Sequence, residues 1–492
     1  MTRRTIVPGS TVAPTSTPRT AQADRTRRPA PRTPPADRFD RRLVLPMVLG
    51  SILNPVNSSI IAVALIPIGR ALGAGTAQTA WLVSALYLAT AIGQPLVGRL
   101  VDAYGPRRLF LIGTALVGVA GVLGTVAPDL GTLIAARVLL GFGTCAGYPA
   151  AMYLIRSEAG RTGIDSPAGI LTTLAVASQT IAVVGPTVGG LLIGLGGWRA
   201  TFAVNIPLSL ACLVLGALRL PRTPTQVQDG RSVRLRDLDP VGVLLFAATL
   251  IALLLFLMDI GVRTLPLLAL AALTGAGFAL RELRTPDPFI DLRVLAGNPP
   301  LLVTYLRTVL AYTVSYAFIY GFTQWLEDAR DLTPSTAGLV LLPVFGIGIL
   351  VSTTTGRRPE IKGKLLVGAA SQVVGCALLL LLDARSSIGL LLLVAAVVGI
   401  PQGLNSLANQ NAVYHQADPA RMGASAGLLR TFMYLGAILA SAATGSFFGE
   451  RPSDGGLHRL ALLMVVISVL FLLVTVLDRS LARVGRPSAA PA

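Results

Sequence analysis

Hydrophobic residues recur along this chain in long blocks that are separated by short polar segments. A helix of about 20 apolar residues spans the hydrocarbon layer of a bilayer, which is roughly 30 Å thick. Fourteen blocks of about this length can be drawn, at approximately 43–67, 79–99, 108–127, 131–153, 168–193, 201–220, 240–259, 265–281, 301–325, 333–354, 364–382, 387–410, 423–449 and 459–477. The pattern therefore predicts an all-α polytopic membrane protein with 14 transmembrane helices.

The blocks are arranged as six, two and six. A polar, Arg-rich connector at 221–239 follows the sixth block, and a second polar segment at 281–300 follows the eighth. We therefore expect two six-helix bundles with two inserted helices between them. The expected boundaries are a cytoplasmic tail at 1–42, a first bundle at 43–220, a connector with the extra helices at 221–300, a second bundle at 301–477 and a cytoplasmic tail at 478–492.

The basic residues lie mainly between the apolar blocks. The chain carries 41 Lys and Arg against 23 Asp and Glu, a net charge of +18. Even-numbered connections are rich in Arg and Lys and odd-numbered ones are poor, so we expect both chain ends on the cytoplasmic side of the plasma (inner) membrane. Charge in this pattern indicates topology and predicts no nucleic-acid partner. Residues 1–42 hold ten Arg and three Asp without an apolar run, which predicts a disordered basic tail.

Sequence features of an enzyme or a metal site are absent. The cysteines, Cys145, Cys212 and Cys376, lie in apolar blocks without metal-ligand spacing, and His415 and His458 are expected at the membrane rim. Neither H-E-x-x-H nor G-x-S-x-G occurs, and no connector is long enough for a soluble catalytic domain. We therefore expect no enzyme activity, no metal and no other cofactor.

A basic, glycine-bounded turn occurs twice. Residues 98–108 (GRLVDAYGPRR) follow the second block, and residues 356–364 (GRRPEIKGK) follow the second block of the last six. Duplicated halves that rock about a site near the midplane are common in secondary transporters. The repeat therefore favours two homologous bundles.

Three motifs indicate a family. The turn at 98–108 fits G-x-L-x-D-x-x-G-x-[RK]-[RK], the fifth block contains G-P-x-x-G-G, and residues 198–207 fit W-R-x-x-F-x-x-N-x-P. Together they resemble the major facilitator superfamily, specifically its fourteen-span drug:proton antiporter group, over about residues 45–477. The matching residues of the first two motifs are Gly98, Asp102, Gly105, Arg107, Arg108, Gly185, Pro186, Gly189 and Gly190.

This resemblance implies a secondary active transporter that exports small amphipathic drugs or secondary metabolites by alternating access. The proton gradient would be its energy source. The turn around Asp102 would latch the cytoplasmic side, because its carboxylate can accept from a neighbouring helix N-terminus or an Arg. The glycines from Gly185 to Gly190 would thin the fifth helix so that a partner packs closely and slides, although helix packing without a functional role is the alternative.

Arg137 begins a run that resembles the fourth-span R-x-x-x-G motif, in which an intramembrane arginine takes part in proton coupling. A charge at that depth should face a cavity and find a partner, or else extend its stem to the interface as an anchor. The acid that usually lies in the first span is Asn57 here, and an amide does not titrate near neutral pH. Coupling through this position is therefore open, and the other acids are expected as solvated charges at helix ends.

Polar and aromatic side chains within the blocks are candidates for a substrate cavity. Tyr312, Tyr316 and Tyr320 follow at four-residue steps, which places them on one helix face. Aromatic rings with hydroxyl tips suit flat amphipathic ligands, although packing against a neighbouring helix is the alternative. Amides within spans must face protein or water. The predicted substrate-binding residues are Asn54, Asn57, Gln94, Gln179, Tyr312, Tyr316, Gln402 and Asn405.

Arg307 and Arg430 lie about two turns inside their spans, by helix rise. Each can attract an anionic group of a substrate or extend its stem to the headgroups, and we expect the second.

Two transport functions stay open at this point. Proton-driven export follows from the resemblance. Uptake or facilitated diffusion of a polar or anionic metabolite without proton coupling is the alternative, which Asn57 and the amide-rich twelfth block favour. In both cases we expect a small-molecule substrate, a bilayer as the surroundings and a functional monomer.

Overall fold

The structure, a computed structural model, describes residues 39–482 except residues 75, 80, 163–167, 223–238, 259–260, 287, 333, 357, 359 and 449–451. Most of the two expected tails and of the connector at 221–239 lies outside the described residues, as do Asp259 and Arg357. The boundaries drawn from the sequence therefore stay predictions.

Fourteen helices within the described residues are long and apolar enough to cross a membrane, which confirms the predicted number. The spans of the first bundle are α1 (Val44–Leu72), α3 (Trp81–Tyr104), α4 (Pro106–Val126), α5 (Leu130–Thr144) with α6 (Gly147–Thr162), α7 (Ala168–Gly196), and α8 (Ala200–Ala203) with α9 (Asn205–Arg219). The inserted pair is α10 (Pro240–Met258) and α11 (Leu265–Arg284). The spans of the second bundle are α13 (Pro299–Ala317), α15 (Pro334–Thr355), α16 (Ile361–Leu379), α17 (Ile388–Gln416), α18 (Met422–Phe448) and α19 (Asp454–Leu477), with short helices α2 (Thr76–Thr79), α12 (Leu292–Ala296) and α14 (Thr323–Asp328) in connections.

Two spans deviate from regular helices that the apolar blocks predict. The fourth span breaks at Cys145 and Ala146, where α6 begins against α1: a Cβ on Gly147 would lie 2.1 Å from the carbonyl oxygen of Gly50. The ninth span has a π-helical turn at Phe318–Phe322. The sequence pattern does not predict the break or the π-helical turn, because the residues in both places are as apolar as those of a regular span.

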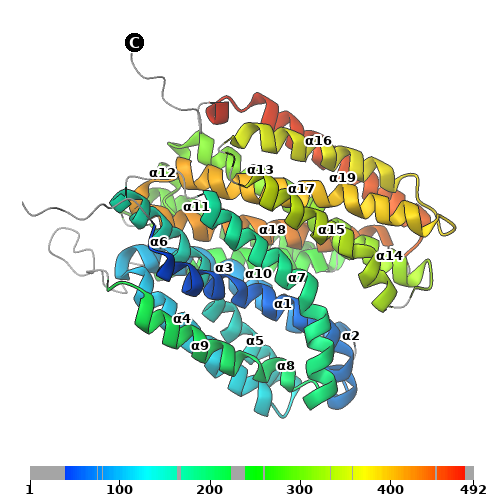
Figure 1. Cartoon of the computed structure of the whole chain (residues 1–492), viewed down its shortest axis with the longest axis horizontal. Helices are drawn as coiled ribbons and strands as arrows, with labels where there is room; N and C mark the ends of the chain where they lie inside the picture. Colours follow the sequence, from blue (N-terminus) through cyan, green and yellow to red (C-terminus); the bar gives the residue numbers. More distant parts are fainter. Residues whose placement is uncertain are drawn as a thin grey trace, which may run out of the picture. The chain divides into compact units, whose positions relative to one another are not determined.

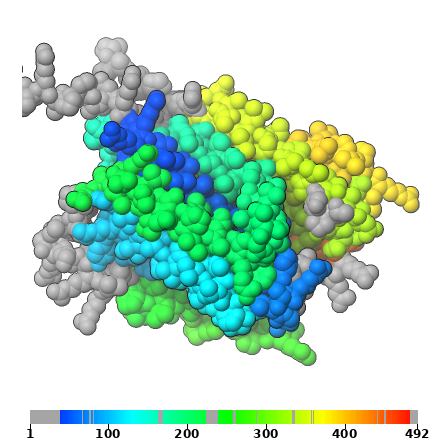
Figure 2. Space-filling view, turned by 60° about the horizontal axis from the view of Figure 1, so that its bottom comes forward, coloured from blue at the N-terminus to red at the C-terminus, as the bar shows by residue number. Residues whose placement is uncertain are grey.

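The fourteen spans form two bundles with the inserted pair at their side. In the first bundle α1 packs on α7, α3 on α5, and α4 on α5 and α9; in the second, α17 packs on α15 and α16, and α13 on α18 and α19. The bundles meet where α3 packs on α18 and α7 on α15 (Figure 1). Figure 2 shows the helices of the first bundle, coloured blue to green, in contact with those of the second in yellow.

The inserted helices lie at the outside of this assembly. Helix α10 packs on α11 and also touches α3 and α18. In contrast, only 6% of the most apolar stretch of α11 is buried. Exposed leucines along α11, including Leu273 and Leu280, give it a lipid-facing surface. At its end Arg281 pairs with Asp239 at 2.7 Å, which fastens α11 to the start of α10.

Candidate functional site

The carboxylate of Asp102 joins the two bundles. It lies at the end of α3 and accepts hydrogen bonds from the backbone N–H groups of Gly423 and Ala424, both at 2.8 Å. These groups form the N-terminus of α18, where helix N–H groups lack partners within the helix and the dipole favours a negative charge. We call this end of the molecule, which carries Arg107, Arg108 and Arg421, the basic end.

Glycines bring the backbones of α3 and α18 into direct contact next to Asp102. A Cβ on Gly98 would lie 2.3 Å from the carbonyl oxygen of Gly423, and a Cβ on Gly427 would lie 2.2 Å from that of Gln94. Real Cβ atoms do not approach backbone so closely, so only glycine allows this packing. Thr431 adds a hydrogen bond to the carbonyl oxygen of Ala91 at 3.0 Å.

The rest of the turn organises the first bundle. Gly105 adopts φ 88°, a left-handed conformation that favours glycine, and connects α3 to α4. Arg107 donates to the carbonyl oxygen of Ala217 on α9 at 2.7 Å. Arg108 is also engaged in a further contact. These residues thus fix the geometry of the turn that presents Asp102.

A second contact between the bundles joins α7 and α15. Gln179 donates to the hydroxyl of Ser352 at 3.3 Å, and a Cβ on Gly356 would lie 2.1 Å from the hydroxyl oxygen of Thr172. Ser352 and Gly356 lie at the end of α15 that leads into the second copy of the basic turn. The duplicated turns thus each follow a helix that packs on the opposite bundle.

The glycines of the fifth-span motif pack within the first bundle. A Cβ on Gly185 would lie 1.9 Å from the hydroxyl oxygen of Ser59, and one on Gly189 would lie 2.7 Å from Val63, both on α1. Within the part of the chain that the structure describes, no atom lies within 4 Å of a Cβ on Gly190, and Pro186 lies inside the helix without ending it. Two of the three glycines therefore provide a close contact between α7 and α1.

Arg137 is fully enclosed and bound by carbonyl groups. Its Nε donates to the carbonyl oxygen of Leu82 at 2.8 Å and its Nη1 to that of Asn57 at 3.1 Å, while Nη2 has no hydrogen-bond partner among the described residues. With 1% of its surface exposed, it does not reach the interface as an anchor. No ion pair of the described residues includes it.

The side chain of Asn57 is occupied by another amide. Asn57 donates to Asn205 Oδ1 at 2.7 Å, and Asn205 donates back to Asn57 Oδ1 at 2.9 Å. Asn57 also donates to the carbonyl oxygen of Leu53. Donors and acceptors of this amide are therefore used within the first bundle, next to the carbonyl group that binds Arg137.

Asn54 connects the first bundle to α18 near the middle of the spans. Its amide nitrogen faces the hydroxyls of Thr90 at 3.3 Å and Thr144 at 3.1 Å, and its oxygen accepts from the hydroxyl of Tyr434 at 2.9 Å. Tyr434 in turn lies against Tyr87 of α3, with ring centroids 5.6 Å apart. Asn54 thus lies at the boundary of the two bundles, beside aromatic rings.

The tyrosines of the ninth span line the same boundary. Ring centroids are 6.0 Å apart for Tyr312 and Tyr316, and 5.5 Å apart for Tyr316 and Tyr320, which confirms the shared helix face predicted from their spacing. Tyr312 and Tyr316 pack in one cluster with Tyr87 and Tyr434. Tyr87 and Tyr434 were missing from the predicted set because isolated tyrosines carry no spacing signal.

The remaining predicted amides divide between the boundary and the bundle interior. Gln94 and Gln179 lie in the boundary helices α3 and α7, and each has a buried Oε1 without a hydrogen-bond partner. Gln402 packs beside Gly348 of α15. Asn405 instead points into the second bundle, where it donates to Gln372 at 3.0 Å, and Gln372 donates to Ser468.

The structure overturns the expected snorkelling of Arg307 and places Arg430 beside a pocket. Arg307 is fully buried and pairs with Asp478 at 2.6 Å. Burial raises the pKa of Asp478, but hydrogen bonds from Ser480 and Arg307 outweigh it, so the pKa lies below its ordinary value and the pair stays ionised near neutral pH. Arg430 lies over the ring of Tyr148 and lines a pocket with Asn409 and Gln410. The ion pair of Arg307 and Asp478 joins residues 171 positions apart, so no local pattern in the sequence predicts it.

The comparison with known families decides the identity of this arrangement. The sequence model described as the Major Facilitator Superfamily matches residues 47–441. The chain belongs to the major facilitator superfamily. This confirms the resemblance seen in the motifs.

Several relatives of this chain are named as export or resistance proteins. The uncharacterized MFS-type transporter YwoD of Bacillus subtilis (strain 168) is 32% identical, over 87% of this chain and 94% of that protein. The Tetracenomycin C resistance and export protein of Streptomyces glaucescens is 28% identical, over 84% of this chain and 76% of that protein. The solved structure of the human organic anion transporter MFSD10 has the same fold, with a TM-score of 0.64 and 16% identity over 90% of this chain and 100% of that one.

This major facilitator protein is therefore a multi-pass membrane transporter of small molecules and not an enzyme. No group of three or more His, Cys, Asp or Glu residues in the described ranges could hold a metal ion.

Proposed function

We propose that this transporter exports small amphipathic molecules from the cytoplasm across the plasma membrane by alternating access, in exchange for protons. The observation that carries the proposal is the bridge from Asp102 to the N-terminus of α18, together with the glycine contacts beside it. The relatives named for export and resistance support the direction of transport.

The basic end is the cytoplasmic side in this proposal. Positive residues concentrate on the cytoplasmic side of membrane proteins, and an even number of spans puts both termini on one side, which is this side in the proposal. The contacts of α3 with α18 and of α7 with α15 then close the cytoplasmic side. Breaking a few hydrogen bonds and separating two glycine contacts would open it, so the interface suits a reversible gate.

The substrate site of this proposal lies at the boundary of the bundles. Asn54, Gln94, Gln179, Tyr312 and Tyr316 stay in it because their side chains or their helices contact the opposite bundle. Asn54 bonds Tyr434, Tyr312 and Tyr316 cluster with Tyr87, Gln179 bonds Ser352, and Gln94 lies on α3, which packs on α18. Tyr87 and Tyr434 join them. Asn57 and Asn405 have a supporting role, since other amides in their own bundles bind them. One monomer supplies all of these residues.

The missing acid in the first span gives a direct test of proton coupling. In everted vesicles energised with an inward-acid gradient, we test a panel of flat amphipathic dyes that includes an anion, a neutral molecule and a cation. We expect accumulation of at least one of them, and a protonophore should abolish it. Asn57→Asp places a titratable group beside the backbone carbonyl that binds Arg137, whose Nη2 lacks a partner, so we expect a steeper dependence on the pH gradient. Asn205→Asp, on the other side of the same amide pair, is the matched control.

Facilitated diffusion is the second candidate, because no carboxylate pairs with Arg137 among the described residues. Equilibration of the dyes without accumulation, unaffected by the protonophore, supports this candidate and rejects antiport.

A further inference from the structure

A small pocket lies between α13, α17 and α18 at the boundary of the bundles. It is lined by Thr308 and Tyr312 from α13, by Ser406, Asn409 and Gln410 from α17, and by Leu429, Arg430 and Met433 from α18. Arg430 and the two amides are the strongest hydrogen-bonding groups in this lining. The pocket adjoins the tyrosine cluster, because Tyr312 and Met433 belong to both.

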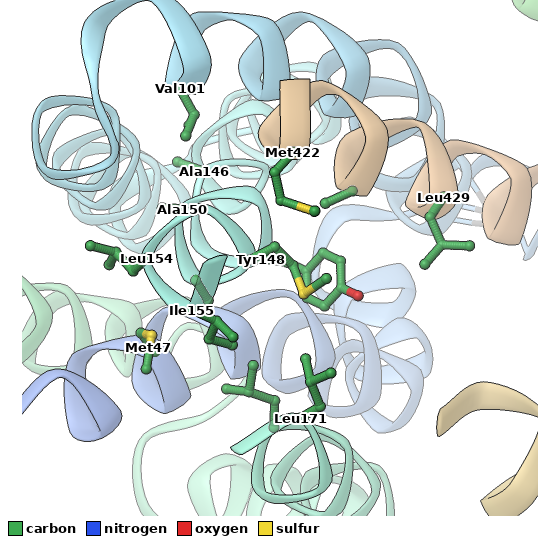
Figure 3. Close-up of a cluster of buried hydrophobic side chains, with 14 of the residues drawn as sticks. Met47, Val101, Ala146, Tyr148, Ala150, Leu154, Ile155, Leu171, Met422 and Leu429 are labelled. Atoms are coloured by element: carbon green, nitrogen blue, oxygen red, sulfur yellow. The ribbon is translucent and has the colours of Figure 1, made fainter. Parts of the chain in front are cut away.

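Arg430 holds its charge in place without a carboxylate. Its guanidinium lies 4.0 Å from the ring centroid of Tyr148, which comes from α6 of the first bundle, and its Nη1 lies 3.6 Å from the sulfur of Met433. Figure 3 shows the ring of Tyr148 reaching from α6 towards Met422 and Leu429 on α18. No ion pair of the described residues includes Arg430. The stacking orients the cation and leaves N–H groups for a ligand.

The buried side chain of Asn409 lacks a hydrogen-bond partner among the described residues. Only 1% of this residue is exposed, yet neither Nδ2 nor Oδ1 has a hydrogen-bond partner among the described residues. Oε1 of Gln410 is also unpartnered, while its Nε2 donates to Ser406, which shares a hydrogen bond with the hydroxyl of Tyr312. A buried amide without partners costs free energy, which a bound polar group would recover.

The chemistry of these groups specifies the ligand. The guanidinium of Arg430, the amide N–H groups of Asn409 and the one hydroxyl hydrogen that the bond between Ser406 and Tyr312 leaves free provide donors for a group of negative charge. One arginine balances one negative charge. The rings of Tyr312 and Tyr316 and the side chains of Leu429 and Met433 provide an apolar, partly aromatic surface beside it.

We infer that this pocket binds the carboxylate of substrates that join one negative charge to a flat aromatic body, with Arg430 and Asn409 as the residues that recognise it. The inference rests on the proposed substrate site and names the class of molecule that enters it. Closing the gate would bring Tyr148 of the first bundle onto Arg430, so that the site is complete only when the bundles meet at this end.

Three dansyl probes separate charge from shape. Dansylglycine carries a carboxylate, dansylamide is neutral and dansylcadaverine is a cation, and all three share one ring system. We expect the purified transporter in lipid nanodiscs to bind dansylglycine most tightly, by fluorescence titration. Arg430→Gln is expected to weaken dansylglycine about tenfold or more while changing dansylamide less than about threefold. Asn409→Leu, which removes the amide at similar volume, is expected to weaken dansylglycine selectively as well.

Arg156→Gln is the matched control. Arg156 of α6 lies over the ring of Tyr414 of α17 at 5.2 Å, so it is the same kind of stacking pair between the bundles but does not line the pocket. This variant should bind dansylglycine like the wild type. Equal losses for all three probes in Arg430→Gln, or wild-type protein that binds dansylamide as tightly as dansylglycine, would overturn the inference.

Two further measurements keep the result decisive. If Arg430→Gln does not give monodisperse protein, Arg430→Lys and competition of dansylglycine by benzoate on the wild type take its place, and absence of competition rejects the carboxylate site. Efflux of the same probes from cells tests the proposed function separately. Efflux of dansylcadaverine without binding of dansylglycine supports export and rejects the carboxylate site. Selective binding of dansylglycine without efflux of any probe supports the carboxylate site and rejects export.

Discussion

Substituting leucine for Gly427 should reduce efflux to the level of cells without the transporter. The Cβ of any larger residue would lie 2.2 Å from the carbonyl oxygen of Gln94 and 2.9 Å from its carbon, and backbone atoms of a packed helix cannot move aside as a flexible side chain can. Overpacking typically costs about 1–3 kcal/mol even where side chains yield. The variant should therefore be held open at the basic end. Efflux of an exported dye measures this together with thiol labelling of Ala91→Cys, because Ala91 packs in one cluster with Met433 and Tyr434 of α18.

Gly445→Leu gives the control for this prediction. Gly445 lies on the same helix, α18, and no atom of the described residues lies within 4 Å of its Cβ position, so leucine there should leave efflux unchanged. Normal efflux by Gly427→Leu at wild-type expression would show that α3 and α18 do not need to close during transport.

Asp102→Asn should lower efflux by roughly tenfold to a hundredfold without loss of protein from the membrane. Asparagine keeps one acceptor oxygen but turns an amide N–H₂ towards a backbone N–H of Gly423 or Ala424, and it removes the negative charge from the N-terminus of α18. Hydrogen bonds to a charged group contribute about 1.5–3 kcal/mol each. Loss of one such bond would lower the population of the closed conformation by roughly tenfold to a hundredfold. Efflux rates and labelling of the opened interface measure the two consequences.

Asp129→Asn is the matched substitution within one bundle. Asp129 accepts from the backbone N–H of Thr132 at 2.8 Å at the start of α5, the same type of contact without a link between bundles. We expect a small stability effect there and normal efflux. An equal loss of efflux in both variants would mean that Asp102 serves helix stability alone and not closure.

The spans and the motif at Asp102 could be predicted from the sequence because their signals are local. Apolar length marks each span, and the turn at 98–108 contains all of its fixed residues within eleven positions. The partner of Asp102 lies more than 300 residues away, on α18, and no local pattern in the chain specifies it. Packing of whole bundles determines that contact.

The roles of single polar residues depended on helix rotation, which a pattern of apolar residues fixes only loosely. Asn54 and Asn57 are three positions apart, yet Asn54 bonds Tyr434 of the second bundle and Asn57 bonds Asn205 of its own. Asn405 and Asn409 are four positions apart, yet one is bound by Gln372 and the other lines the Arg430 pocket. Small differences in direction decide whether an amide is structural or available to a substrate.

A reversible cross-link across the basic end tests alternating access most directly. Gln179 on α7 and Ser352 on α15 lie 3.3 Å apart at their side-chain ends, so Gln179→Cys with Ser352→Cys can be joined by a short bis-methanethiosulfonate reagent, with each single variant as a control. The native cysteines are buried and can be replaced by serine in the background. We predict that the cross-link stops efflux and that a reductant restores it to the rate of the untreated double variant. Gln179→Cys also removes a substrate-site amide, so each single variant is compared with its own untreated rate, which the reagent should leave unchanged. Efflux that continues at its original rate with the two helices joined would contradict the account.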